Sequence, residues 1–373
     1  MAPRLDSAAD PSALAAATAG DLCRQVLALA GVGPADAEVV ADTLVDASLR
    51  GVDSHGLALL PTYVERLRSG QMRPGRTWIV RRDTPAAALC DGQGGLGPVL
   101  ARRACDLAAA KARAAGVGCV VLRDGNYVGA LGYYARRLAQ SGAVALVAAN
   151  ASPRVAPHGG RSGLHGTNPL AWAAPVEGGP PLVFDSATGY SAARVARAAE
   201  AGQRLPAGVA LDARGRPTRD AAAALDGTLL PVGGPLGYGL GLLVDVLTAG
   251  LAASPVGRQV PPAAQLDGPH GCSFTALALD PEALGGAGAL ASSAAQLVVQ
   301  ARAVSPVEGG GPVRVPGDRA QESWHRRVRA GIPIGPMQWD RLVTRLAAAG
   351  IGVSLAAGGQ PVVASLPEGG APS

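Results

Sequence analysis

A serine and a histidine stand side by side in the segment Asp53-Ser54-His55-Gly56. Imidazole titrates near neutral pH, so a histidine that projects from a helix start into a cleft can act as an acid, a base or a polarising group. The alternative is structural, because an Asp or Ser at a helix start accepts a hydrogen bond from a free backbone N–H. The residues alone give these two interpretations equal weight.

Two further histidines, His158 and His165, lie in a segment rich in glycine and proline, beside Gly166-Thr167-Asn168-Pro169. Polar side chains in such a loop can bind a ligand, but Asn-Pro and Gly-Thr pairs also form ordinary turns. No His and carboxylate have a spacing typical of a metal site, such as His-x-x-x-His. We therefore expect no metal ion.

Residues 92–97 fit the pattern Gly-x-Gly-x-x-Gly between an expected strand and an expected helix. In dinucleotide-binding proteins such glycines let a pyrophosphate approach a helix N-terminus, and an acidic residue follows about twenty positions later. The nearest candidate, Asp124, lies farther on. Because the motif alone is weak, a tight glycine turn is the favoured interpretation.

The apolar patterning predicts the elements that must position these residues. Helices are expected over 11–31, 34–50, 53–70, 98–115, 133–141 and 240–253. A further long, alanine-rich helix is expected after the strand at 275–279 and ends at about residue 304. Strands are expected over 78–80, 86–90, 118–122, 143–149, 182–185 and 275–279. Segments 150–181 and 203–237 are expected to be mainly loops. Helices and strands do not alternate regularly, so a simple doubly wound parallel sheet is not favoured.

The composition restricts the class of protein and its location. The chain has 373 residues, of which 48% are hydrophobic, so it can bury a sizeable core and is not intrinsically disordered. The longest apolar run, 240–253, is interrupted by Asp245 and is too short to span a membrane. Five widely spaced cysteines and a start without a signal-like apolar stretch favour a reducing, cytoplasmic location.

The net charge of +5 says little about partners, because the arginines are scattered and only 3% of residues are aromatic. Single-stranded nucleic acids are bound by aromatic stacking platforms within basic grooves, and this chain shows neither. We expect no nucleic-acid or membrane partner, and a small molecule as substrate.

Nine short segments carry a resemblance to one family across nearly the whole chain. They are residues 50–56, 61–67, 129–135, 152–157, 159–160, 166–169, 185–188, 237–240 and 315–318. In this order they resemble the malate/L-lactate dehydrogenase family, which includes sulfolactate and ureidoglycolate dehydrogenases and Δ1-piperideine-2-carboxylate reductase.

The resemblance implies an α/β fold with a mixed, largely antiparallel sheet flanked by helices, which binds NADP or NAD without a Rossmann unit. It implies a homodimer acting on 2-hydroxy, 2-oxo or cyclic 2-imino acids, and a turn at 92–97. The expected regions are a helical segment over 1–75 that contributes to the substrate site, a mixed-sheet cofactor region over 76–240, a C-terminal region over 241–366 and a disordered tail over 367–373.

The resemblance also implies roles for individual residues. The candidate catalytic residues are Ser54, His55 and Tyr127. The candidate substrate-binding residues are Leu59, His165, Thr167 and Arg194. The candidate cofactor-binding residues are Asn126, Gly129, Asp185, Ser186, Ala187, Leu236, Gly317, Asp318 and Arg319.

Three positions depart from the family pattern that the resemblance implies. The family has an arginine four residues after the histidine of the Ser-His pair, and this chain has Leu59 there. In the family's Asn-His-Phe-Gly motif, Tyr127 takes the place of the histidine. In its Lys-Gly-Tyr-Gly motif, Leu236 takes the place of the lysine. Without that arginine a substrate carboxylate loses a charge-assisted contact worth roughly 1.5–3 kcal/mol, unless Arg194 replaces it. Tyr127 either donates a proton, with His55 or His165 sharing the task, or merely packs.

We therefore favour an NAD(P)H-dependent oxidoreductase that reduces a carbonyl or imine of a non-standard substrate in specialised metabolism. The first alternative is a fold repurposed for a non-redox cyclisation, elimination or isomerisation. The second is a non-catalytic homologue that binds a partner.

Overall fold

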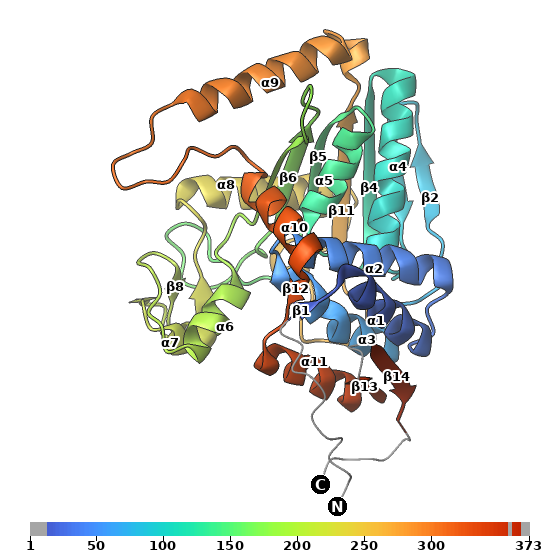
Figure 1. Ribbon diagram of the computed structural model, residues 1–373, viewed down its shortest axis with the longest axis vertical. Helices are drawn as coiled ribbons and strands as arrows, with labels where there is room; N and C mark the ends of the chain where they lie inside the picture. Colours follow the sequence, from blue (N-terminus) through green and yellow to red (C-terminus); the bar gives the residue numbers. More distant parts are fainter. Residues whose placement is uncertain (1–12, 357–359, 367–373) are drawn as a thin grey trace, which may run out of the picture. The chain divides into compact units, whose positions relative to one another are not determined.

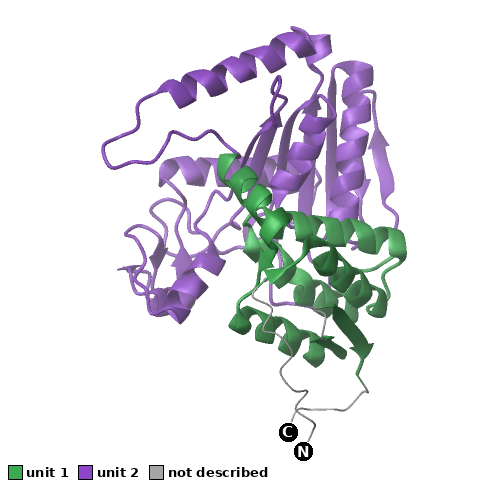
Figure 2. Cartoon of the chain, viewed as in Figure 1, with its two compact units in different colours: residues 1–75, 318–373 green, residues 76–317 purple. Residues whose placement is uncertain are grey.

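The computed structural model describes residues 13–356 and 360–366, and these form two compact units (Figure 2). The first unit contains the residues up to Gly75 and those from Asp318 onward, and the second contains Arg76–Gly317. The expected region 241–366 is thus divided between the two units at residue 317. The expected disordered tail, 367–373, lies outside the described residues.

The first unit is mainly helical. Its N-terminal part contains α1 (Ala16–Leu29), α2 (Pro34–Leu49) and α3 (Leu60–Arg68), and its C-terminal part contains α10 (Asp318–Ala330) and α11 (Pro336–Ala348). Two small antiparallel sheets pair β1 (Ala13–Leu14) with β12 (Ile332–Pro333) and β13 (Ile351–Leu355) with β14 (Pro361–Ser365). The predicted helices at 11–31 and 34–50 correspond to α1 and α2, whereas α10 and α11 were not predicted.

A seven-stranded sheet forms the centre of the second unit (Figure 1). Its strands, in spatial order, are β2 (Ile79–Asp83), β3 (Ala87–Asp91), β4 (Val117–Gly125), β11 (Cys272–Leu279), β5 (Val144–Ala149), β6 (Leu170–Ala174) and β7 (Leu182–Ser186). Only β3 and β4 run parallel, and every other neighbouring pair is antiparallel. This mixed, largely antiparallel sheet flanked by helices confirms the predicted fold class. Strand β6 lies within the segment 150–181 that was expected to be loop.

The parallel pair is joined by α4 (Gly97–Ala115), which begins with Pro98 in its first turn and ends at Gly116, with φ +78°. Helix α5 (Leu131–Gln140) packs beside α4 on the same face of the sheet. The core between helices and sheet is built largely from small side chains, with Tyr134 and Phe274 in edge-to-face contact at 5.6 Å. On the other face, the Thr275 hydroxyl donates to Leu247 O at 2.7 Å.

The segment 203–237, expected to be mostly loop, contains a small sheet of three two-residue strands and a short helix. They are β8 (Ala210–Leu211), β9 (Pro217–Thr218), α7 (Ala221–Leu225) and β10 (Thr228–Leu229). With α6 (Ala192–Glu200) they enclose a separate core that includes Val155, Val195 and Val209. The rest of the second unit contains α8 (Pro235–Asp245), a π-helical turn (Val246–Gly250) and α9 (Ala287–Ala303).

Candidate functional site

The turn that carries Ser54 and His55 belongs to the first unit. It is a single 3-10 turn, Asp53–His55, and a second one, Leu57–Leu59, follows before α3 begins. Between them Gly56 has ψ −141°, which breaks any continuous helix. The helix predicted from 53 to 70 therefore starts only at Leu60, and positions 55 and 59 do not share one α-helical turn.

Glycine at position 56 is required by the approach of α2. A Cβ there would lie 2.0 Å from the Ser48 Oγ, and this same hydroxyl accepts a hydrogen bond from Leu57 N at 3.0 Å. The short turn is thus held directly against the end of α2. This explains in physical terms why the motif ends in glycine.

The half-buried side chains of Ser54 and His55 contact each other, with Oγ 3.0 Å from Nδ1. Burial lowers the pKa of His55 below its ordinary value, so the neutral imidazole prevails at pH 7. A neutral imidazole carries one N–H donor and one acceptor nitrogen, and the contact with Ser54 engages one of these two atoms. Leu59 is also half-buried and offers only hydrocarbon.

The glycine-rich segment 92–97 is folded onto the end of β4. Gly92 N donates to Arg123 O and Gly94 N to Asp124 O, both at 2.9 Å, and Gly95 N donates to Gly92 O at 2.8 Å. These amides are therefore engaged by the chain itself. The geometry supports the interpretation of this segment as a tight turn rather than a phosphate loop.

Tyr127 lies two residues after the end of β4 in the second unit. A Cβ at Gly97 would lie 2.1 Å from Tyr127 O, so the backbone at 127 is pressed against the N-terminus of α4. The side chain of Asn126, 2% exposed, accepts from Tyr127 N at 3.0 Å. The half-buried Tyr127 ring meets the ring of His270 at an angle of 67°, with centroids 6.2 Å apart. His270 was not among the predicted site residues, since no motif surrounds it.

His165 is completely buried. Its Nδ1 lies 2.7 Å from Gly166 O, and its ring stacks on Tyr238 with centroids 6.0 Å apart. Glycine at 241 makes room for it, since a Cβ there would lie 2.4 Å from the imidazole Cε1. The structure thus places His165 as a packing element between two motif segments, rather than as an open side chain.

A group of buried polar side chains surrounds Asp245, which is 7% exposed. Burial raises the pKa of its carboxyl group, while Asn168, His165 and other neighbours oppose this shift. Asn168 is fixed by two hydrogen bonds, from Ala151 N at 3.1 Å and to Gly241 O at 2.9 Å. This cluster joins the segment around Thr167 to α8.

Three of the motif segments are bonded to one another in the second unit. Thr188 N donates to Thr167 O at 2.9 Å, and Val232 N donates to Thr188 O at 2.9 Å. The carboxylate of Asp185 accepts from Gly132 N at the start of α5, at 2.7 Å. The structure therefore brings together the predicted residues around 129, 167, 185 and 236.

The remaining predicted cofactor and substrate residues lie in more open positions. Ser186 Oγ donates to Ala187 O at 3.0 Å, and both residues are half-buried. Arg194 on α6 is exposed, and Leu236 is 69% exposed. Gly129 has φ +82° and Gly317 has φ +100°. Asp318 and Arg319 begin α10 and so belong to the first unit with Ser54 and His55.

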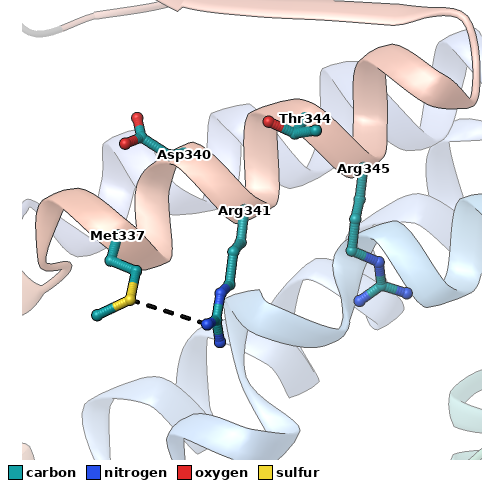
Figure 3. Close-up of a pocket in the computed structure, with 5 residues that line it drawn as sticks. All are labelled: Met337, Asp340, Arg341, Thr344 and Arg345. Carbon is teal, nitrogen blue, oxygen red and sulfur yellow. Dashed lines mark hydrogen bonds between the residues drawn. The ribbon is translucent and has the colours of Figure 1, made fainter. Parts of the chain in front are cut away.

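A shallow pocket of about 380 Å³ lies along α11 (Figure 3). It is lined by Met337, Asp340, Arg341, Thr344 and Arg345. It contains none of the predicted site residues. Among the residues that the structure describes, no three His, Cys, Asp or Glu side chains are grouped to hold a metal ion, and no helix is long and apolar enough to cross a membrane.

The sequence and the fold match those of known dehydrogenases. A family model described as malate/L-lactate dehydrogenase matches residues 14–343, which is most of the chain. The chain therefore belongs to the malate/L-lactate dehydrogenase family, as its motifs predicted.

Relatives and a solved structure agree with this assignment. The chain is 35% identical to a Δ1-pyrroline-2-carboxylate/Δ1-piperideine-2-carboxylate reductase of Pseudomonas syringae over 336 residues, which cover 86% of this chain and 93% of the relative. It is 38% identical over 231 residues to an NADP+-dependent (2R)-3-sulfolactate dehydrogenase of Chromohalobacter salexigens, covering 61% of this chain and 69% of the relative. Sulfolactate dehydrogenase of Methanocaldococcus jannaschii has the same fold, with a TM-score of 0.84 at 31% identity, over 91% of this chain and 97% of that one.

Proposed function

We propose that this member of the family is an NAD(P)H-dependent oxidoreductase that reduces a carbonyl or imine carbon, and that its substrate is a non-standard one in specialised metabolism. The observations that carry the proposal are the contact between Ser54 Oγ and His55 Nδ1 at 3.0 Å and the hydrocarbon side chain at position 59 of the following turn. A pair of hydrogen-bonding groups suits a polar substrate atom. Leucine in place of arginine disfavours a small 2-oxo acid held by its carboxylate.

One feature of the second unit supports a dinucleotide as ligand. Helix α8 has no acidic residue in its first turn, its N-cap is Gly234, and no side chain caps it. A helix N-terminus of this kind favours an anionic group such as a pyrophosphate. The exposed arginines Arg154 and Arg194 of the same unit supply further positive charge. Either NADP or NAD is compatible with these features; one relative is named for NADP+.

When bound, the reduced nicotinamide supplies a hydride. The remaining task for the chain is to deliver a proton to the oxygen or nitrogen that becomes negative. We assign this to the hydroxyl of Tyr127, because burial keeps His55 mainly neutral at pH 7 and so a weak proton source. Ser54 and His55 carry hydrogen-bonding groups of a kind that can bind a polar group of a ligand.

The proposal is tested by titrating the protein with NADPH and with NADH in a calorimeter, followed by assays with Δ1-piperideine-2-carboxylate and with pyruvate. A nucleotide present at 100 times its dissociation constant should also stabilise the fold by about 2.7 kcal/mol. Deuterium carried by the nicotinamide should appear in the reduced product.

Arg194→Gln should weaken nucleotide or substrate binding, whereas Arg197→Gln, exposed on the same helix, should not. Absence of binding by both nucleotides would exclude the proposal.

We further propose that the protein works as a homodimer in the cytoplasm. In α9 only Ala294 is buried, while Leu297 and Val299 are 62% and 67% exposed and Arg302 is the one charged residue of the helix. A second copy covering this helix would bury apolar surface that otherwise faces water. Light scattering should give twice the chain mass, and Leu297→Glu should yield monomers.

The described cysteines are all free, which fits a reducing compartment.

A further inference from the structure

The register of the central sheet places two segments far apart in sequence at one end of it. Strand β4 runs antiparallel to β11, and the pairing joins Gly125, the last residue of β4, to Cys272, the first residue of β11. The residues that follow β4 and those that precede β11 must therefore meet at the same end. These residues are Tyr127 and His270.

The two rings contact each other edge to face. Their centroids are 6.2 Å apart and their planes are inclined by 67°, within the range in which aromatic rings attract each other. His270 is 6% exposed, whereas Tyr127 is half-buried and keeps access to a ligand. The imidazole therefore lies on the inner side of the phenol.

Buried polar groups fix the loop that carries His270. The hydroxyl of Ser152 donates to Pro261 O at 2.7 Å. Gly271, with φ +72°, packs so tightly on this proline that a Cβ would lie 2.7 Å from its Cδ. On the other side of His270, the side chain of Asn150 accepts from Ser273 N at 2.7 Å. The backbone on either side of His270 is thus anchored.

Tyr127 is anchored as well, because its carbonyl oxygen touches the N-terminus of α4 at Gly97. With both backbones fixed, the contact between the two rings is a built feature rather than a chance approach of mobile side chains. A phenol beside a buried imidazole differs chemically from a phenol alone. Free phenols ionise near pH 10, so a tyrosine that has given up its proton needs a nearby group that can return one near neutral pH.

We propose that His270 is a further residue of the active site, which acts through Tyr127 by orienting the phenol and returning a proton to it. The inference rests on the proposed function. When the substrate carbon is reduced, the O–H bond of Tyr127 breaks and an O–H or N–H bond of the product forms. The neutral imidazole of His270 then relays a proton: one ring nitrogen gives its proton to the phenolate while the other takes up a proton that comes from solvent.

The test follows the phenol of Tyr127 by NMR in protein labelled at the tyrosine Cζ with carbon-13. The chain has six tyrosines, and Tyr127→Phe identifies the signal. In the unmodified protein the Tyr127 signal should shift between about pH 5 and pH 8, as the adjacent imidazole gains or loses its charge. In His270→Phe, which keeps an aromatic ring but no titratable nitrogen, this shift should disappear.

Matched variants separate His270 from other titrating groups. His325→Phe changes an exposed histidine in the first unit and should leave the shift intact. The acidic residues nearest along the two segments are Asp124 and Asp267, and Asp124→Asn and Asp267→Asn should also leave it intact. If His270→Phe does not fold, the reciprocal measurement applies: Tyr127→Phe should move the titration of the His270 imidazole signal.

A Tyr127 signal that does not move between pH 5 and 8, or one that moves equally in His270→Phe, overturns the inference. This outcome is independent of redox activity, so it differs from failure of the proposed function, which appears as absence of nucleotide binding. With an active substrate, His270→Phe should lower kcat by about tenfold or more with little change in KM. An unchanged kcat would likewise contradict the relay.

Discussion

Arg327 on α10 binds the carboxylate of Asp53 with both terminal nitrogens, and its Nη2 lies 3.3 Å from Oδ2. Nη1 also donates to the backbone oxygen of Ser48 at 2.5 Å. The two partners of this ion pair are 274 positions apart in the chain. The turn that presents Ser54 and His55 is therefore fixed by a helix from the C-terminal part of the same unit.

Removing this guanidinium should loosen the turn. Arg327→Gln leaves the partly exposed Asp53 carboxylate without this partner. We expect the free energy of unfolding to fall by about 1–3 kcal/mol, because hydrogen bonds to charged groups contribute about this much to stability. Urea denaturation monitored by circular dichroism measures it. Arg326→Gln, an exposed neighbour on the same helix, is the control and should change stability little. Equal midpoints for both variants would contradict the anchoring role.

The packing of His165 against α8 predicts an unusual sensitivity at position 241. Gly241→Ala would place a Cβ 2.4 Å from the imidazole Cε1, and overpacking of this kind costs about 1–3 kcal/mol. The control is Gly239→Ala on the same helix, where a Cβ meets no atom within 4 Å. The double variant His165→Ala with Gly241→Ala should lose less stability than the sum of the two single variants. Strict additivity in the thermal or urea midpoints would show that the two positions do not interact.

The lowered pKa of His55 predicts a pH dependence of stability. Because the folded state disfavours the charged imidazole, this residue contributes stability above the unfolded value of about 6.5, and the contribution is lost as the pH falls toward the lowered value. His55→Gln should therefore reduce the loss of stability between pH 8 and pH 5. Urea midpoints of both proteins at these two pH values provide the measurement. His158→Gln, at an exposed position, should leave the difference unchanged.

Local sequence signals located the elements that are themselves local. The apolar runs that end at Leu122 and Ala149 predicted β4 and β5, and the proline and glycine at the ends of α4 gave its bounds to within a residue. Helix α10 escaped prediction because only Ser323 of its residues is buried and most of the others are charged or polar. It carries no apolar stripe for pattern analysis to find.

In the candidate site, too, the sequence predicts local features but not long-range contacts. The motif around Ser54 and His55 could be recognised from sequence, but the interruption at Gly56 depends on the contact with Ser48 and could not. His270 has no motif, and its place beside Tyr127 follows only from the register of β4 against β11. Long-range pairing decides such contacts, and periodicity along one segment does not encode it.

Leu59 offers the most direct test of substrate class. If the side chain at 59 contacts the substrate, Leu59→Arg supplies a charge-assisted, two-point contact to a carboxylate worth roughly 1.5–3 kcal/mol. We therefore expect kcat/KM for pyruvate reduction to rise by about tenfold to a hundredfold, with no comparable rise for a ketone without a carboxylate, such as butanone. Initial rates of NADPH or NADH oxidation measure both. Leu59→Met keeps a similar volume without charge and should favour neither substrate. A rise of equal size for both ketones, or for neither, would show that position 59 does not select for the carboxylate.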